Sequence, residues 1–224
     1  MRKVQFQNDY FYHIYNRGID KRNIFMDEKD YIRFLRSMRE LNTSKVIESL
    51  YRLNQIRRRE AKLLRFETNR RSLASSDEPL VEFIAYCLNP NHFHIMVRQS
   101  AEQGITKFMH KLSTAYTKYF NNKYNRSGSL FQETYKATQV KTDEYILYLS
   151  AYINGNSEIH KIAKAKNYQW CSYPDYLGKR KGVLCKKNII LKDFQNIGEY
   201  KNLVGIIIKE SSLRKDEIKK YLLE

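Results

Sequence analysis

The sequence has few cysteines, few acidic residues and no long hydrophobic run. Its three cysteines, Cys87, Cys171 and Cys185, are an odd number without a Cys-x-x-Cys pair, which argues against a disulfide framework or a zinc ribbon and fits a reducing cytoplasm. No apolar run approaches the length of a membrane span, and no signal-peptide pattern precedes Tyr10. We therefore expect a cytoplasmic, nucleoid-associated protein with no membrane partner.

The shortage of acidic residues leaves a strongly basic chain. Lys and Arg number 41 against 24 Asp and Glu, a formal net charge of +17. Such a surface attracts polyanions, and nucleic acid is the commonest of them. The 18 tyrosines supply stacking platforms for bases as well as core side chains. A length of 224 residues suits one domain with an extension or a small appendage.

Residues 83–99 form the most informative stretch. Turn-prone residues 89–91 separate two short runs of β-prone side chains, which predicts two strands joined by a turn. The second run begins with His92 and His94, and alternate side chains of a strand share a face. The pair is half of a metal site, two polar residues on the solvated face of a sheet, or part of a zinc hydrolase site that needs a further ligand.

The flanking segments predict alternating strands and helices. Residues 9–17 are aromatic and β-prone, and residues 131–140 resume a β-like character. Apolar residues recur at helical spacing in residues 27–41, for which Asp27 is a candidate cap, and in residues 102–124. Residues 42–79 are a basic insertion, and the charged, helix-prone residues 44–66 within it fit either a solvated helix or an arm that follows a nucleic-acid backbone.

Several basic residues are candidates for phosphate contacts. Lys107, Lys111 and Lys118 fall on the polar side of the predicted helix 102–124. The other candidates lie in loops or at a strand end: Arg17, Lys123 and Arg126. Of the remaining histidines, His13 is expected to be hydrogen-bonded on the sheet, and His110 and His160 are expected on the surface.

A helix that starts after Thr142 carries a candidate nucleophile. At a spacing of four residues, Tyr148, Tyr152 and Asn156 share one side of this helix. A tyrosine stripe is usually core. However, an Asn oxygen beside a His-x-His pair would complete a three-ligand site for Mg²⁺ or Mn²⁺ with positions open for a phosphate.

These motifs together resemble the single-tyrosine HUH transposases, the IS200-like family, and in particular their REP-associated relatives. The resemblance rests on His92-Phe93-His94 after Asn-Pro-Asn, the Arg-Ser-Gly-Ser-Leu-Phe-Gln segment and Tyr152-Ile-Asn-Gly-Asn156. It covers about residues 10–178. It implies an α+β fold with a ferredoxin- or RRM-like βαββαβ core, an antiparallel sheet, the helical insertion 42–79 in a catalytic domain 1–178, and a C-terminal extension 179–224.

The resemblance also implies a chemistry. Tyr152 would attack a phosphodiester of single-stranded or hairpin DNA and form a 5′-phosphotyrosine, with His92, His94 and Asn156 as ligands of Mg²⁺ or Mn²⁺. Such an enzyme could act as a homodimer. Tyr148 is the alternative nucleophile, one turn earlier on the same face. A non-catalytic hairpin DNA-binding protein or domesticated regulator on the same fold is the alternative function, and a zinc hydrolase lacks a third strong ligand.

Overall fold

The computed structural model describes residues 5–44 and 79–221, with side chains up to residue 216. The helix expected at residues 44–66, and nearly all of the insertion 42–79, lie outside the described residues. Within the described part, no helix is both long enough and apolar enough to cross a membrane.

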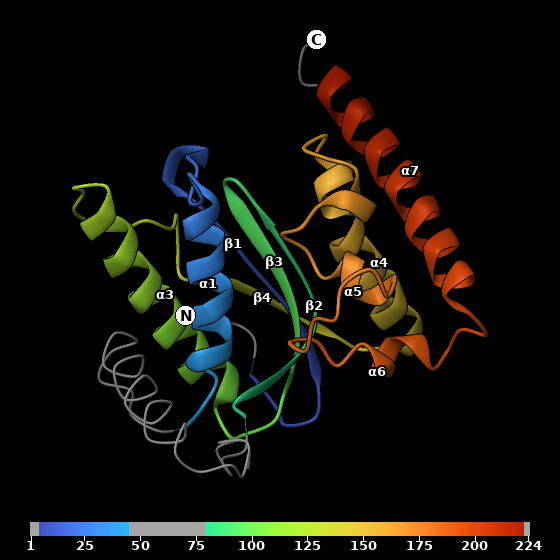
Figure 1. Ribbon diagram of the computed structural model, residues 1–224, viewed down its shortest axis with the longest axis horizontal. Helices are drawn as coiled ribbons and strands as arrows, with labels where there is room; N and C mark the ends of the chain where they lie inside the picture. Colours follow the sequence, from blue (N-terminus) through green and yellow to red (C-terminus); the bar gives the residue numbers. More distant parts are fainter. Residues whose placement is uncertain (1–4, 45–78, 222–224) are drawn as a thin grey trace, which may run out of the picture.

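A four-stranded antiparallel sheet forms the centre of the structure (Figure 1). Its strands follow the spatial order β2-β3-β1-β4. They are β1 (Phe11–Arg17), β2 (Val81–Asn89), β3 (His92–Gln99) and β4 (Lys136–Val140). The β4 strand is shorter than the β-like run expected at residues 131–140, because the chain from 131 to 135 contains only an isolated bridge, between Phe131 and Gly18.

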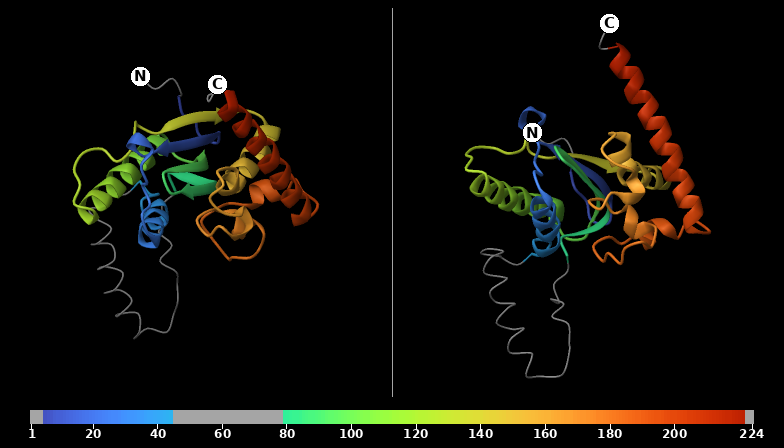
Figure 2. Two further views of the ribbon diagram at one scale, coloured as in Figure 1. Left: turned by 90° about the horizontal axis from the view of Figure 1, so that it is seen from above. Right: turned by 45° about the horizontal axis from the view of Figure 1, so that its top comes forward.

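Helices cover both faces of the sheet, as the three views of Figures 1 and 2 show. On one face lie α1 (Glu28–Glu40) and α3 (Gly104–Lys123). On the other lie α4 (Asp143–Ile159), α5 (Tyr173–Tyr176), α6 (Asn188–Leu191) and α7 (Ile197–Tyr221). Two short 3-10 turns, η1 (Ile19–Lys21) and η3 (Ala165–Asn167), lie in the connections. The order β1-α1-β2-β3-α3-β4 confirms the predicted ferredoxin-like βαββαβ core.

The predicted cap of α1 forms as expected. The Asp27 side chain accepts a hydrogen bond from the Asp30 amide, and the Asp30 carboxylate accepts in return from the Asp27 amide. This reciprocal capping satisfies amides that a helix start leaves without partners. The apolar side of α1 then packs with α3 against the sheet, where Phe34 lies against Phe93 of β3.

The helix α4 begins where the sequence predicted. The Thr142 hydroxyl accepts a hydrogen bond from the Tyr145 amide at 3.2 Å and caps the helix. One side of α4 packs on β2 and β3, where Ile153 joins a second hydrophobic core with Met96. This second core lies on the opposite face of the sheet from the α1/α3 core.

The C-terminal helix α7 packs against α4. A Cβ atom added to Gly155 of α4 would lie 2.6 Å from the Ile208 side chain of α7, so the two helices approach closely at this glycine. At the preceding residue, the buried side-chain amide of Asn154 accepts a hydrogen bond from the Ser172 hydroxyl at 2.6 Å and donates one to the Tyr200 hydroxyl at 2.7 Å. Asn154 therefore holds α4 and α7 together within the core.

One side chain joins the two ends of the insertion. Asn42, just after α1, donates to the Val81 carbonyl at 2.7 Å and accepts from the Val81 amide at 2.9 Å. The two hydrogen bonds hold the chain entering residues 43–80 beside the chain leaving them.

Candidate active site

The strand β3 presents its two histidines to the α4 side of the sheet. As strand alternation requires, Phe93 and Ile95 face the α1/α3 core while His92 and His94 face the opposite way. The two imidazole centroids lie 5.2 Å apart with perpendicular rings. Both histidines line the same cleft.

His13 contacts His94 from the neighbouring strand β1. The His13 Nε2 and His94 Nδ1 atoms lie 2.9 Å apart, so one ring donates a hydrogen bond to the other. Burial lowers the pKa of His13 to about 4. Burial, together with the nearby His13 and His92, lowers the pKa of His94 well below its ordinary value. Both rings are therefore neutral at pH 7 and keep a lone pair.

His92 belongs to a chain of polar contacts that reaches α4. Its Nδ1 donates to the Asn91 side-chain oxygen at 2.6 Å, and its Nε2 accepts from Asn89 Nδ2 at 2.9 Å. The same Asn89 Nδ2 donates to Asn156 Oδ1 at 2.6 Å. Burial lowers the pKa of His92 to about 4, although its contact with Asn156 acts in the other direction. Two acceptor atoms, His92 Nε2 and Asn156 Oδ1, thus converge on one donor.

Tyr152 of α4 lies over His94. The two rings meet edge to face with centroids 5.9 Å apart. Burial raises the pKa of the Tyr152 phenol, while a contact with Asn156 lowers it in part. Tyr148, one turn earlier, stacks on the far side of Tyr152 at 6.4 Å. The described residues that line the cleft include Tyr152 but not Tyr148.

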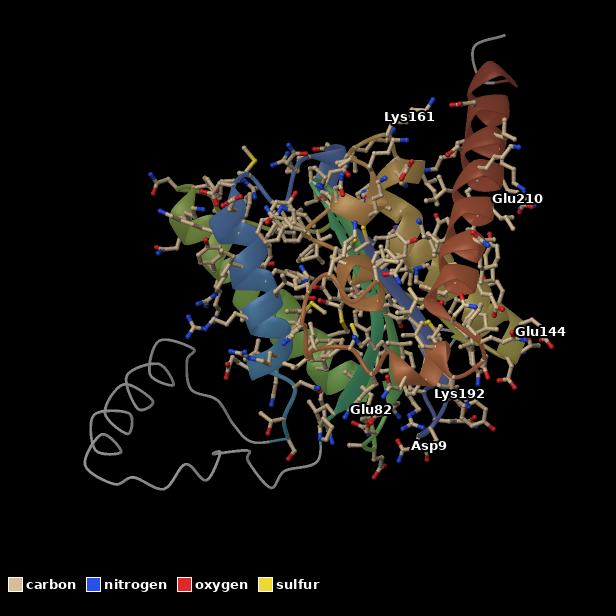
Figure 3. The ribbon with its side chains drawn as sticks, turned by 45° about the vertical axis from the view of Figure 1, so that its right-hand side comes forward. Asp9, Glu82, Glu144, Lys161, Lys192 and Glu210 are labelled. Atoms are coloured by element: carbon tan, nitrogen blue, oxygen red, sulfur yellow. The ribbon has the colours of Figure 1, made fainter. Side chains whose placement is uncertain are left out.

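The cleft has a volume of about 910 Å³ and is predominantly basic. Its charged lining comprises Arg17, Lys21, Lys136, Lys161 and Lys215 with the acidic Glu133 and Asp216. Figure 3 labels Lys161 just beyond the C-terminal end of α4, at the opposite end of that helix from Glu144. A phosphate that entered the cleft would lie among cations beside the histidines and Tyr152.

His160 is exposed, as the sequence predicted, but it has two partners that the sequence did not indicate. Its ring centroid lies 4.5 Å from that of His92, and its Nε2 lies 2.6 Å from the Lys215 ammonium of α7. The contact joins residues 55 positions apart, and no local pattern in the sequence signals it. The C-terminal extension therefore supplies part of the cleft wall.

The predicted DNA-contacting residues separate into two groups. Arg17 lines the cleft. The other five lie on or just after α3, which packs on the opposite face of the sheet. Lys118 is exposed there, whereas Lys123 forms ion pairs with Asp27 and Asp30. The other three donate hydrogen bonds to groups of the same chain: Lys107 to the Glu102 carbonyl, Lys111 to the Thr43 carbonyl and Arg126 to the Asn121 side chain.

The site offers a mixed set of nitrogen and oxygen donors for a divalent ion. Among the described residues, no three His, Cys, Asp or Glu side chains are grouped to hold a metal, so a third ligand has to be an amide or water. His92, His94 and Asn156 supply two neutral imidazoles, which are typical ligands of transition-metal ions, and an amide oxygen, which suits Mg²⁺ and Mn²⁺. The amide Nδ2 of Asn156 is buried without a hydrogen-bond partner among the described residues. The hydrogen-bonding capacity of this side chain is therefore only partly used.

Comparisons with known proteins bear on the family resemblance and on the fold. The sequence model of the IS200-like transposase family matches residues 65–156, a segment that includes both histidines, Tyr152 and Asn156. A solved structure of a REP-associated tyrosine transposase bound to a REP hairpin aligns with a TM-score of 0.53 and 8% identity, covering 80% of this chain and 86% of that one. No curated protein matches. The family resemblance predicted from the sequence is confirmed, and the structural match confirms the fold.

Proposed function

From this relationship to the IS200-like transposases, we infer that the chain is a metal-dependent DNA strand-transferase. It nicks single-stranded or hairpin DNA through a covalent 5′-phosphotyrosine at Tyr152. The observation that carries the proposal is the position of the Tyr152 ring, 5.9 Å from that of His94 and inside a basic cleft.

The geometry favours Tyr152 over Tyr148 as the nucleophile. Tyr152 lines the cleft and contacts a histidine of the sheet, whereas Tyr148 contacts the sheet histidines only through Tyr152 in the contacts described above. Because burial raises the pKa of the Tyr152 phenol, the nucleophile is protonated at pH 7 and has to lose its proton as it attacks.

His92, His94 and Asn156 would hold the divalent ion. A bound ion would neutralise the phosphate and favour the phenolate form of the nucleophile. His13 fixes the orientation of His94 through the 2.9 Å contact between their ring nitrogens, the kind of support that metal-binding histidines usually receive from a neighbour. His92 Nε2 and Asn156 Oδ1 would both exchange the Asn89 amide for the ion.

The remaining residues of the cleft act on the phosphate. Arg17, Lys21 and Lys136 reduce the repulsion between the anionic phosphodiester and an approaching phenolate. As the bond between Tyr152 Oη and phosphorus forms, the bond between phosphorus and the 3′ oxygen breaks. The phenol loses a proton and the 3′ oxygen gains one, which leaves a free 3′-hydroxyl and an ester that a second strand can attack without ATP.

The test is covalent capture of DNA by the full chain. The protein is incubated with labelled hairpin DNAs from the sequence flanking its gene, with Mg²⁺ or Mn²⁺, and the products are separated on a denaturing gel. We expect a protein–DNA adduct that maps to Tyr152 by mass analysis, is abolished by a chelator and by Tyr152→Phe, and is strongly reduced in His92→Ala.

Tyr148→Phe is the matched control, because it removes the neighbouring phenol of the same helix face and should retain the adduct. An adduct in Tyr152→Phe would contradict the assignment of the nucleophile. Salt-dependent binding of the same hairpins without an adduct under any divalent ion would contradict the enzymatic function and support a non-catalytic hairpin-binding protein instead.

A further inference from the structure

Three tyrosines of α4 form an aligned row that ends at the nucleophile. The ring centroids of Tyr145 and Tyr148 lie 5.6 Å apart with planes inclined by 15°, and those of Tyr148 and Tyr152 lie 6.4 Å apart with planes inclined by 11°. We call these three residues the tyrosine row. It runs from the cleft toward the N-terminal end of the helix.

The outer end of the row is open to solvent. Tyr145 is 43% exposed and lies outside the two hydrophobic cores. The helix α4 packs mainly on β2 and β3, and the same face of β1 and β4 is covered only in part, because Val140 is buried while Thr138 is exposed. On the outer face of β1 and β4, Tyr15 is half-buried and Lys136 and Thr138 are exposed. Aromatic and basic side chains therefore continue from the cleft across an accessible surface.

We propose that the tyrosine row binds single-stranded DNA by stacking an unpaired base on the exposed ring of Tyr145, at the end of the row that leads through Tyr148 to the phosphate that Tyr152 attacks. The proposal rests on the function inferred above for Tyr152. Aromatic rings stack on any base, so such a surface tolerates different sequences. It requires a single strand, because in a duplex the faces of each base are covered by the neighbouring base pairs.

The charges around the row indicate how the strand is held. Exposed lysines stand near both ends of β4, Lys136 at its start and Lys141 just after its end. In contrast, the first turn of α4 exposes Asp143 and Glu144 next to Tyr145, and these carboxylates repel phosphates. The contact at Tyr145 is therefore made by bases and not by the backbone.

The same charges disfavour a protein partner for this face. The centre of a protein interface is depleted of charged residues, whereas the exposed Lys141, Asp143 and Glu144 lie within four positions of Tyr145 along the chain. A flexible polyanion whose bases reach the rings while its phosphates follow the lysines fits this mixture of groups, in keeping with the net charge of +17.

The test measures binding separately from cleavage. In the full chain carrying Tyr152→Phe, fluorescence anisotropy compares a labelled oligothymidylate of about 12 nucleotides with an abasic strand of equal length. We expect the oligothymidylate to bind more tightly. Tyr145→Leu should weaken its binding about 5-fold to 150-fold, since one stacked base contributes about 1–3 kcal/mol. Binding of the abasic strand and the salt dependence should not change.

Two controls make the result specific. Tyr145→Phe keeps the ring and should bind the oligothymidylate like the parent protein. Tyr10→Leu removes a comparable ring that is 49% exposed and lies outside the row, and it should leave binding of the oligothymidylate unchanged. Equal affinity for the thymidylate and abasic strands, or unchanged binding in Tyr145→Leu, would overturn the proposal. Binding and adduct formation are measured in separate assays. The results can therefore support base stacking on the tyrosine row while contradicting Tyr152 as the nucleophile, or support Tyr152 while contradicting base stacking.

Discussion

At the scale of single residues, the contact between Lys123 and Asp30 shows how a basic residue can serve the fold. The Asp30 carboxylate is fully buried. It accepts hydrogen bonds from the Lys123 ammonium at 2.7 Å, the Tyr119 hydroxyl at 3.0 Å and the Tyr124 hydroxyl at 2.8 Å. Lys123 thereby joins the end of α3 to the start of α1.

We predict that Lys123→Ala lowers the free energy of unfolding by about 3 kcal/mol, because it leaves a buried carboxylate without its counter-ion. Urea unfolding of the purified protein measures the loss. Lys107→Ala is the matched control, since Lys107 is exposed and bonds only a backbone carbonyl in the described contacts, and its effect should stay below about 0.5 kcal/mol. Equal stabilities of the two variants would contradict a structural role for Lys123.

The same pair gives a pH dependence with a definite sign. Burial acts to raise the pKa of Asp30, but the hydrogen bonds from Lys123, the Met26 amide and the two phenols outweigh it and lower the pKa. The unfolded carboxyl therefore binds protons at a higher pH than the folded one, so this contribution is present at neutral pH and is lost as the pH falls below about 4. The stability difference between the wild type and Lys123→Ala should shrink in acid.

At the scale of elements, the close approach of α4 and α7 at Gly155 can be tested against a second glycine. An Ala Cβ at Gly155 would lie 2.6 Å from Ile208, whereas one at Gly205 of α7 would have no atom within 4 Å. Replacing a helix-interior glycine by Ala gains about 1 kcal/mol, and overpacking costs about 1–3 kcal/mol. We predict that Gly205→Ala stabilises the protein and that Gly155→Ala destabilises it, as measured by urea unfolding.

Shortening the opposing side chain identifies the cause. Ile208→Ala should reduce the difference between glycine and alanine at position 155, giving a coupling of about 1 kcal/mol in a double-mutant cycle. If the penalty of Gly155→Ala persisted unchanged in the Ile208→Ala background, contact with α7 would not be its origin.

The elements with local signals were predictable from the sequence. Asp27 and Thr142 cap their helices as expected, because a capping side chain bonds an amide three residues away. The alternation of His92, Phe93 and His94 likewise follows from the period of a strand. Residues 131–135 were wrongly expected to extend β4, since β-prone side chains form a strand only where a neighbour is available to pair with.

The contacts that complete the candidate site have no local signal. His13 reaches His94 from 81 residues away, and Asn89 reaches Asn156 from 67 residues away. Such pairs depend on strand register and on where α4 packs, which composition and spacing do not specify. For the same reason, the helical lysines expected to contact DNA could not be placed on a face of the sheet before the fold was known.

At the scale of the whole molecule, one chain can bring the residues of the candidate site together. The histidines come from β3 and the candidate nucleophile from α4, and the His94 and Tyr152 rings meet with centroids 5.9 Å apart. We predict that mixing His92→Ala with Tyr152→Phe does not restore adduct formation in the covalent capture assay. The wild type diluted with Tyr152→Phe should lose activity only in proportion to its concentration.

Recovery of the adduct in the mixture of inactive variants would contradict this prediction. It would mean that Tyr152 of one copy acts beside the histidines of another, as an exchange of α4 between two chains would produce. Measuring the mass of the active species in solution would then identify the dimer.

The two hydrogen bonds between Asn42 and Val81 also bear on how the length of this chain can change during evolution. The side chain of Asn42 holds the end of α1 beside the start of β2 through hydrogen bonds of 2.7 Å and 2.9 Å to the Val81 backbone. The length of the chain between them therefore has little influence on how α1 and β2 are placed. The entropy of closing a loop grows only logarithmically with its length. The segment after position 42 is thus a place where genetic insertions and deletions can accumulate while the sheet and the candidate site keep their geometry.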